Sequence, residues 1–175
     1  MKTTLVRRRP GRTDRLVAET SDRVPGAAAR RGFEAALGGA PLFQGMSSHD
    51  VAAALAEFDE CHFPGGSRIV LEGLRGSDFF IIVGGSAAVL VDGWRVATLA
   101  AGDFFGEIAV LGSGLRSASV RAETPLHCLV LPNGKLEALL LVHPRLGLNL
   151  IRIVIGRYQD VAGRRQPPAR ELASA

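Results

Sequence analysis

Aromatic residues and cysteines are scarce in this sequence. Phe, Trp and Tyr make up 6% of its 175 residues, and there are two cysteines, Cys61 and Cys128. The two are far apart and have no metal-ligand spacing, so we expect reduced, buried thiols rather than a disulfide. No apolar run approaches the ~18 residues of a membrane helix, and no apolar segment follows the basic N-terminus as a signal peptide requires. We therefore expect a cytoplasmic protein that does not contact the membrane.

Positive charge is lacking where a nucleic-acid-binding domain would carry it. The net charge is +4, yet residues 41–160 hold nine Lys and Arg against twelve Asp and Glu. The basic excess lies in residues 1–40, with nine against four, and in residues 161–175, with three against one. A nucleic-acid-binding domain shows its basic patch on the folded part of the chain. Nucleic acid is therefore not an expected partner.

Grouped histidines are lacking too. The four histidines share no ligand spacing, and no His-x-His occurs. A metalloenzyme on a β-roll would need clustered imidazoles and a carboxylate. Surface or half-buried positions account for all four histidines, so we expect no metal site, no cofactor and no catalytic residue. The four are His49, His62, His127 and His143.

Glycine, in contrast, is abundant, with 21 residues. Residues 1–40 predict a basic, largely disordered tail with a short helix near its end, and residues 163–175 predict a second disordered tail. Residues 41–162 predict one domain. It opens with a helix, for which Ser47 and Asp50 have capping-box spacing.

Short apolar segments separated by turn residues follow from Cys61 on. Asp92-Gly93 is the strongest hairpin signal among them, and strands this short with turns this regular predict a barrel or roll. After Leu131 the pattern becomes helical, with Asn133 predicted as the N-cap of one helix and Pro144 in the first turn of a longer one. An apolar stripe on the last helix predicts core packing and, second, a homodimer seam; it comprises Gly147, Leu150, Ile151, Val154, Tyr158 and Val161.

The stretch that carries chemistry runs from Phe104 to Val120. Gly106 lets the backbone approach a ligand closely, and the N–H groups at the start of a short helix from Glu107 are suited to an anion. Arg116 can clamp phosphate oxygens with paired donors, helped by the Ser117 hydroxyl and the Ala118 N–H. Glu107 beside an anion makes sense if it accepts a hydrogen bond from a sugar hydroxyl. Phosphate and ribose together indicate a nucleotide.

This stretch resembles the phosphate-binding cassette of the cyclic-nucleotide-binding domain family. The family pattern is F-G-E-[IL]-[AG]-L, a connector, and then R-[STA]-A-x-V, and the similarity extends from about Pro41 to Val161. Two departures occur: Leu74 and Ser77 stand where the family's E-G-D-x-G-D corner has Asp, and Leu115 replaces a common proline. The resemblance implies an eight-stranded β-roll (a jelly-roll-like double-stranded β-helix), mainly β, with N-terminal helices and two C-terminal helices.

The resemblance also implies roles for individual residues. Glu107 would accept the ribose 2′-hydroxyl, Arg116 would pair with the cyclic phosphate, and the last helix would act as a lid whose Arg157 or Tyr158 covers the base. The remaining implied contacts are the backbone of Gly106, Ile108, Ala109 and Ala118 at the phosphate, and Val89 and Val96 beneath the sugar and base.

The function expected on this basis is a stand-alone cyclic nucleotide sensor in signal transduction, with cAMP favoured over cGMP and no enzymatic activity. Its effector protein is unknown, and a homodimer would form through Leu150, Val154 and Tyr158. One alternative is the ligand-binding subunit of a transcription regulator whose DNA-binding part is elsewhere, because only fourteen residues follow Val161. Another is a degenerate roll used only for protein contacts.

Overall fold

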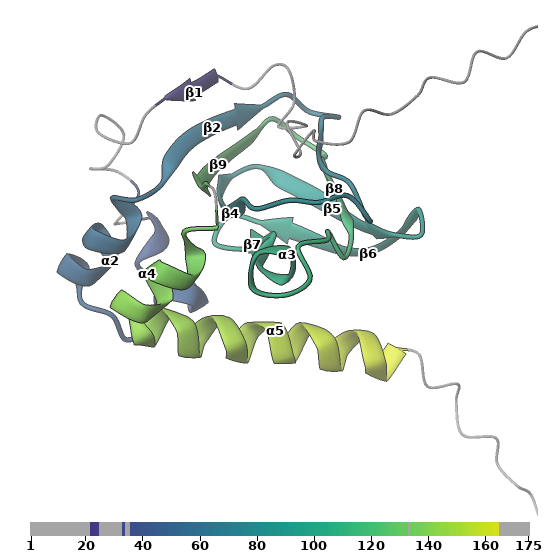
Figure 1. The fold of residues 1–175 in the computed structure, drawn as a ribbon. Helices are drawn as coiled ribbons and strands as arrows, with labels where there is room; N and C mark the ends of the chain where they lie inside the picture. Colours follow the sequence, from purple (N-terminus) through teal and green to yellow (C-terminus); the bar gives the residue numbers. More distant parts are fainter. Residues whose placement is uncertain (1–21, 25–32, 34–35, 133, 165–175) are drawn as a thin grey trace, which may run out of the picture.

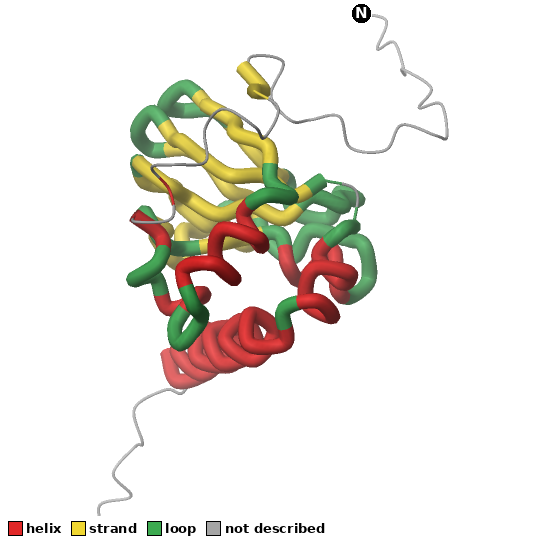
Figure 2. Tube along the Cα trace, turned by 90° about the vertical axis from the view of Figure 1, so that its left-hand side faces the viewer, coloured by secondary structure: helices red, strands yellow, loops and turns green. Residues whose placement is uncertain are grey.

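The computed structural model describes residues 22–24, 33, 36–132 and 134–164, and in these it shows nine strands in two antiparallel sheets. One sheet has the order β1-β2-β9-β4-β7 and the other β3-β8-β5-β6. The helices lie on one side of the strands (Figures 1 and 2). The strands are β1 (Asp22–Val24), β2 (Asp59–Phe63), β3 (Arg68–Val70), β4 (Phe79–Gly84), β5 (Ser86–Val91), β6 (Trp94–Ala100), β7 (Phe104–Phe105), β8 (Ser119–Ala122) and β9 (Leu126–Leu131).

The predicted fold class is confirmed: β2 to β9 are the eight strands of the roll. The hairpin between β5 and β6 turns at Asp92 and Gly93, whose φ angles are 50° and 80°. Two successive positive φ angles are the requirement of a type I′ turn, and Val91 pairs with Trp94 directly across it. β1 was not predicted; it pairs with β2 from within the segment assigned to the N-terminal tail.

Two apolar clusters hold the roll together. One lies between the sheets and includes Phe63, Phe80, Ile82 and Phe105. The other joins the five-stranded sheet to the helices. Successive side chains along a strand point to opposite faces of the sheet. Phe79 and Ile81 of β4 therefore join the helical cluster, while Phe80 and Ile82 join the inter-sheet cluster. The helical cluster also includes Leu42, Phe43, Val51, Leu136, Leu146 and Leu150.

The helical elements are η1 (Pro41–Phe43), α2 (Ser48–Leu55), α3 (Glu107–Leu111), α4 (Leu136–Val142) and α5 (Pro144–Arg164). The predicted cap of α2 is confirmed, since the Ser47 hydroxyl accepts a hydrogen bond from the Asp50 N–H at 3.1 Å. The helix predicted after β9 begins later than expected: Lys135 is at the N-cap of α4, and Asn133 lies outside the described residues.

α5 runs along one side of the roll and beneath α3 (Figure 1). Its first half is fixed by Asn149, which is 5% exposed. The Asn149 side-chain amide donates to the carbonyl oxygens of Leu42 at 3.0 Å and Gln44 at 2.9 Å. These bonds tie α5 to the segment at η1. Breaking them would leave the buried Asn149 amide without partners, which would cost about 1–3 kcal/mol of stability.

The apolar stripe predicted on the last helix is only partly correct. Leu150 is buried in the core of its own domain, so the prediction that it contacts a second copy is wrong. Ile151 and Tyr158, in contrast, are 54% and 74% exposed. The helix carries apolar residues on more than one face, and the domain core covers only the face with Leu146 and Leu150. The homodimer stays a prediction, and the exposed apolar residues available to it are Leu148, Ile151, Ile155 and Tyr158.

Among the described residues, no single helix is long and apolar enough to span a membrane. α4 and the part of α5 up to Asp160 are together long and apolar enough to span one, but the two helices meet at a bend of 120°.

Candidate functional site

A cavity of about 500 Å³ lies between the four-stranded sheet, α3 and α5. All nine residues predicted to bind a ligand line it, although they come from three separate elements and the loops beside them. They are Val89, Val96, Gly106, Glu107, Ile108, Ala109, Arg116, Ser117 and Ala118. The strand register explains part of this: Val89 of β5 pairs with Ala97 of β6 on one side and with Val120 of β8 on the other.

Gly106 is the residue that turns the chain from β7 into α3. Its φ of 94° lies in the left-handed region, which glycine adopts without the strain of a side chain. A Cβ atom built here would lie 2.6 Å from the carbonyl oxygen of Asp78 and 2.7 Å from Nη1 of Arg116. Glycine is therefore required twice, for its backbone angle and for the close approach of the arginine.

Arg116 is 6% exposed and lies directly beneath this turn. Its Nη1 donates to the carbonyl oxygens of Asp78 at 2.9 Å and Gly106 at 3.2 Å, and its guanidinium lies 5.8 Å from the centre of the Phe80 ring. A Cβ atom at Gly76 would collide with the guanidinium. The arginine is thus held in one orientation beside the first residues of α3.

The corner at residues 72–77 supports the connector that leads to Arg116. The N–H of Gly73 donates to the Arg116 carbonyl, and the Arg116 N–H donates to the Leu74 carbonyl, both at 2.8 Å. Gly76 donates to Gly114 at 3.0 Å. These bonds are made by backbone groups, so this corner supports the segment at Arg116 without the Asp side chains of the family pattern.

Glu107, the first residue of α3, is 7% exposed and faces the same cavity. Burial raises the pKa of its carboxyl, and the positive charges of Arg157 and Arg116 oppose that rise only in part. A buried carboxylate at the start of a helix, near the guanidinium groups of Arg157 and Arg116, can accept a hydrogen bond from a ligand hydroxyl.

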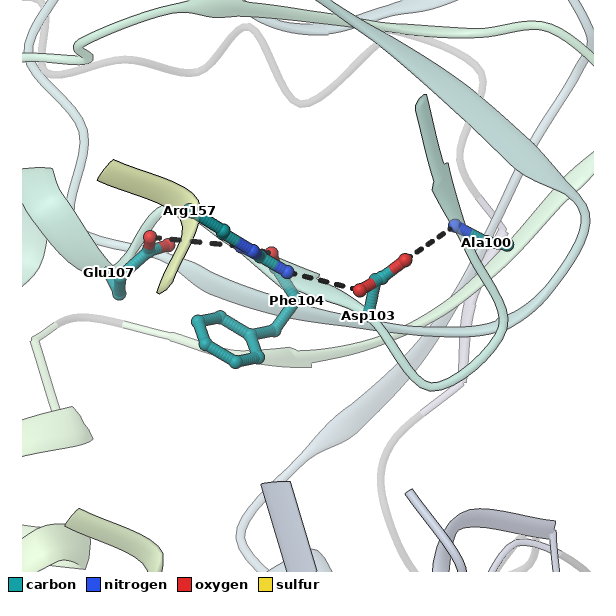
Figure 3. Close-up of polar contacts among 5 residues, drawn as sticks. All are labelled: Ala100, Asp103, Phe104, Glu107 and Arg157. Carbon is teal, nitrogen blue, oxygen red and sulfur yellow. Dashed lines mark hydrogen bonds and ion pairs between the residues drawn. The ribbon is translucent and has the colours of Figure 1, made fainter. Parts of the chain in front are cut away.

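Arg157 reaches this site from α5 (Figure 3). Its Nη1 donates to the Phe104 carbonyl at 2.7 Å, and its Nη2 lies 3.1 Å from Oδ1 of Asp103. Nη1 also lies 4.0 Å from Oε1 of Glu107, and the guanidinium stacks 4.4 Å from the centre of the Phe104 ring. Arg157 thus connects the last helix to both the turn before β7 and the start of α3.

The resemblance left Arg157 and Tyr158 open as residues that cover a base. Both line the cavity, but the Arg157 guanidinium is bound to the protein at its charged end, whereas the Tyr158 side chain is 74% exposed.

Sequence reasoning missed Asp103 as a site residue. Its place in the Gly102-Asp103 turn, directly before the motif, was the available signal: Oδ2 accepts from the Ala100 N–H at 3.0 Å, and Oδ1 holds Arg157.

The cavity lining combines two kinds of groups. Glu107, Arg116 and the start of α3 suit a hydroxyl group and an anion. Aliphatic side chains suit a flat apolar group; they include Val70, Val89, Val96, Leu99 and Val120. A ligand that uses both kinds of groups carries a charged part and a largely apolar part.

Comparison with known proteins gives three findings that agree. A family model described as cyclic nucleotide-binding domain matches residues 60–143. The cAMP-dependent protein kinase regulatory subunit of Emericella nidulans is 36% identical over 97 residues, 54% of this chain and 24% of that protein. The cGMP-dependent protein kinase of Toxoplasma gondii is 37% identical over 83 residues, 47% of this chain and 8% of the kinase.

Among solved structures, the catabolite activator protein of Thermus thermophilus superposes with a TM-score of 0.65 at 28% identity. The match covers 71% of this chain and 61% of that one. This chain therefore spans a quarter or less of the length of the two kinase-related proteins and less than two thirds of the activator chain.

Proposed function

Because this chain carries a cyclic nucleotide-binding domain, matched over residues 60–143, we propose that its cavity binds a cyclic nucleoside monophosphate, cAMP in preference to cGMP. The protein is a regulatory sensor that stands alone and catalyses nothing. The observation that carries this proposal is the meeting of Glu107 and Arg116 with the start of α3 in one cavity. The longer of the two kinase-related matches is to a cAMP-dependent regulatory subunit, which supports cAMP as the ligand.

Each part of the ligand has a matching group. The cyclic phosphate is placed between the Arg116 guanidinium and the backbone N–H groups of α3, because charge-assisted hydrogen bonds and helix N-termini both favour an anion. The ribose 2′-hydroxyl donates to Glu107. The base lies against the aliphatic side chains of Val89 and Val96, and Tyr158 of α5 lines the same cavity.

The signal leaves the site through α5. Arg157 binds the turn before β7 and lies 4.0 Å from Glu107, the residue that would hold the ribose. A ligand that engages Glu107 therefore changes the surroundings of the residue that fixes the second half of α5. A change in the position or order of this helix is the output that an effector protein would detect.

Calorimetric titration with cAMP, cGMP and 5′-AMP tests the proposal. We expect saturable binding of cAMP, weaker binding of cGMP, and much weaker binding of 5′-AMP, whose open phosphate has a different shape and charge. Arg116→Leu should cost about 1.5–3 kcal/mol of binding free energy, as expected for a hydrogen bond to a charged group. Arg121→Leu is the control, because Arg121 is exposed on β8, and circular dichroism must show that both variants are folded.

The possible outcomes separate the competing functions. Tighter binding of cGMP would correct the base preference and keep the site. No heat and no thermal shift with either cyclic nucleotide at saturating concentration would contradict the proposal and leave the degenerate roll as the better account. Sequence-specific binding of duplex DNA by the purified chain with cAMP would favour the transcription-regulator alternative.

A further inference from the structure

A second group of chemistry-bearing side chains lies on the outer face of the five-stranded sheet, away from the cavity. Glu60 and His62 are two residues apart on β2 and therefore share one face. His127 of β9 is the register partner of His62. Cys61 lies between Glu60 and His62, and Cys128 directly follows His127. These two cysteines are also register partners, and both point inward and are buried.

These three side chains bring their ligand atoms together. Oε1 of Glu60 lies 2.6 Å from Nε2 of His127 and 3.8 Å from Nε2 of His62. The two imidazole rings stack with centres 4.1 Å apart and planes inclined by 16°. One ligand atom from each residue fits within a group no wider than 4.8 Å. Ligand spacing along the sequence therefore did not reveal that His62 and His127 lie side by side.

The surroundings hold the group in place while leaving it open. The Phe33 ring meets the His127 ring edge-on at 5.1 Å between centres. The register partner of His127 on the neighbouring strand β4 is Gly84, so no side chain stands directly opposite this imidazole on β4. The side chain of His62 is 54% exposed, whereas those of His127 and Glu60 are 24% and 14% exposed. An ion can thus approach from solvent on the His62 side.

We propose that Glu60, His62 and His127 form a binding site for a divalent transition-metal ion of the Zn²⁺ class. Two imidazoles and one carboxylate are ligands that Zn²⁺, Co²⁺ and Ni²⁺ accept, whereas Mg²⁺ and Ca²⁺ prefer sets of oxygen ligands. Zn²⁺ bonds to imidazole nitrogen and carboxylate oxygen at roughly 2.0–2.2 Å, so neighbouring ligand atoms of a tetrahedral site are about 3.3 Å apart. The two separations from Oε1 of Glu60, 2.6 and 3.8 Å, bracket this value.

The ion would join β2 to β9, because its ligands come from both strands. A solvent molecule would complete its coordination, because three protein ligands leave one tetrahedral position open.

The site is separate from the proposed nucleotide site. None of its three residues lines the cavity between α3, α5 and the four-stranded sheet. The metal proposal therefore does not depend on the proposed function, and each can fail alone.

Titration of the untagged, chelator-treated full chain with Zn²⁺, followed by calorimetry under reducing conditions, tests the proposal. We expect one Zn²⁺ per chain and no comparable binding of Mg²⁺. His62→Ala and Glu60→Gln should each weaken Zn²⁺ binding by at least about 10-fold. His49→Ala is the control, because the His49 side chain is 92% exposed on α2. Co²⁺ should give the spectrum of nitrogen and oxygen ligands without the charge-transfer band of thiolates.

His62→Ala is the decisive variant, since an exposed side chain can be removed without loss of the fold; its thermal unfolding must match that of the control. No saturable Zn²⁺ binding by the wild-type chain would overturn the proposal. Equal binding by the wild type, His62→Ala and Glu60→Gln would overturn it as well, and so would a thiolate band in the Co²⁺ spectrum. cAMP affinity measured on the same variants should stay within experimental error of the wild type.

Discussion

Nη2 of Arg157 lies 3.1 Å from Oδ1 of Asp103, which joins the second half of α5 to the turn between β6 and β7. The same guanidinium donates to the Phe104 carbonyl at 2.7 Å. Asp103 in turn accepts from the N–H of Ala100. A single side chain of the last helix is therefore bound to the loop that leads into the candidate phosphate site.

We predict that Arg157→Ala loosens the second half of α5. About 1 kcal/mol of stability should be lost, because the contacts are charge-assisted but the side chain is 32% exposed. Hydrogen exchange of the α5 amides after Val154 should become faster. Arg152→Ala, which removes an exposed arginine from the same helix, should change neither quantity. Equal effects of the two variants would contradict the role given to Arg157.

Gly106→Ala should destabilise the protein more than Gly66→Ala does. Both glycines have a left-handed φ, 94° and 86°, so both alanines carry about 1–2 kcal/mol of backbone strain. A Cβ atom at Gly66 meets nothing within 4 Å, whereas one at Gly106 meets Asp78 and Arg116. Urea unfolding should show an excess loss of about 1–3 kcal/mol for Gly106→Ala. Equal losses would show that the arginine does not approach this turn as described.

The carboxyl of Glu107 should give a specific pH dependence. Burial raises its pKa in the folded chain, so its contribution to stability is fully present below its ordinary pKa of about 4.3 and is lost as the pH rises through the raised value. Glu107→Gln should therefore be more stable than the wild type near neutral pH, and the difference should shrink as the pH falls below that window.

The measurement is the free energy of unfolding of both proteins across this pH range without ligand. Glu137→Gln is the control, since Glu137 is exposed on α4. A Glu107→Gln variant that is less stable than the wild type at neutral pH would show that the arginines beside Glu107 outweigh its burial.

Cys61 and Cys128 should not react with thiol reagents in the folded protein. They lie opposite each other on β2 and β9 with exposures of 1% and 0%. Burial, and then the neighbouring Cys61, raise the pKa of the Cys128 thiol, so little of the reactive thiolate forms. A disulfide-exchange reagent should count no thiols in the native chain and two after denaturation. Ser113→Cys, at an exposed position, should add one fast native thiol.

Local sequence patterns predicted the roll and the cavity residues well, for a physical reason. The turn at Asp92-Gly93, the cap at Ser47 and the motif around Gly106 depend on neighbours a few residues away, and the structure bears out each of these local features. The motif also brings two cavity-lining polar residues together, because Glu107 and Arg116 lie only nine positions apart.

Features that depend on distant pairing were missed. His62 and His127 come together through the register of β2 and β9, which no local spacing encodes. The sequence did not predict which apolar face of α5 is exposed. The helix has apolar residues on several faces, and only the tertiary fold determines which face the core covers. The contact from Arg157 to Asp103 likewise spans 54 residues.

The measurement that tests the account most directly is the titration of the isotopically labelled chain with cAMP, followed by amide chemical shifts. We predict saturable shifts that are largest for Gly106 to Ala109 and for Ala118, with the outer face of β2 and β9 unchanged. Shifts that are absent at saturating cAMP, or that leave the amides of α3 unmoved while others respond, would contradict the assignment of the phosphate site.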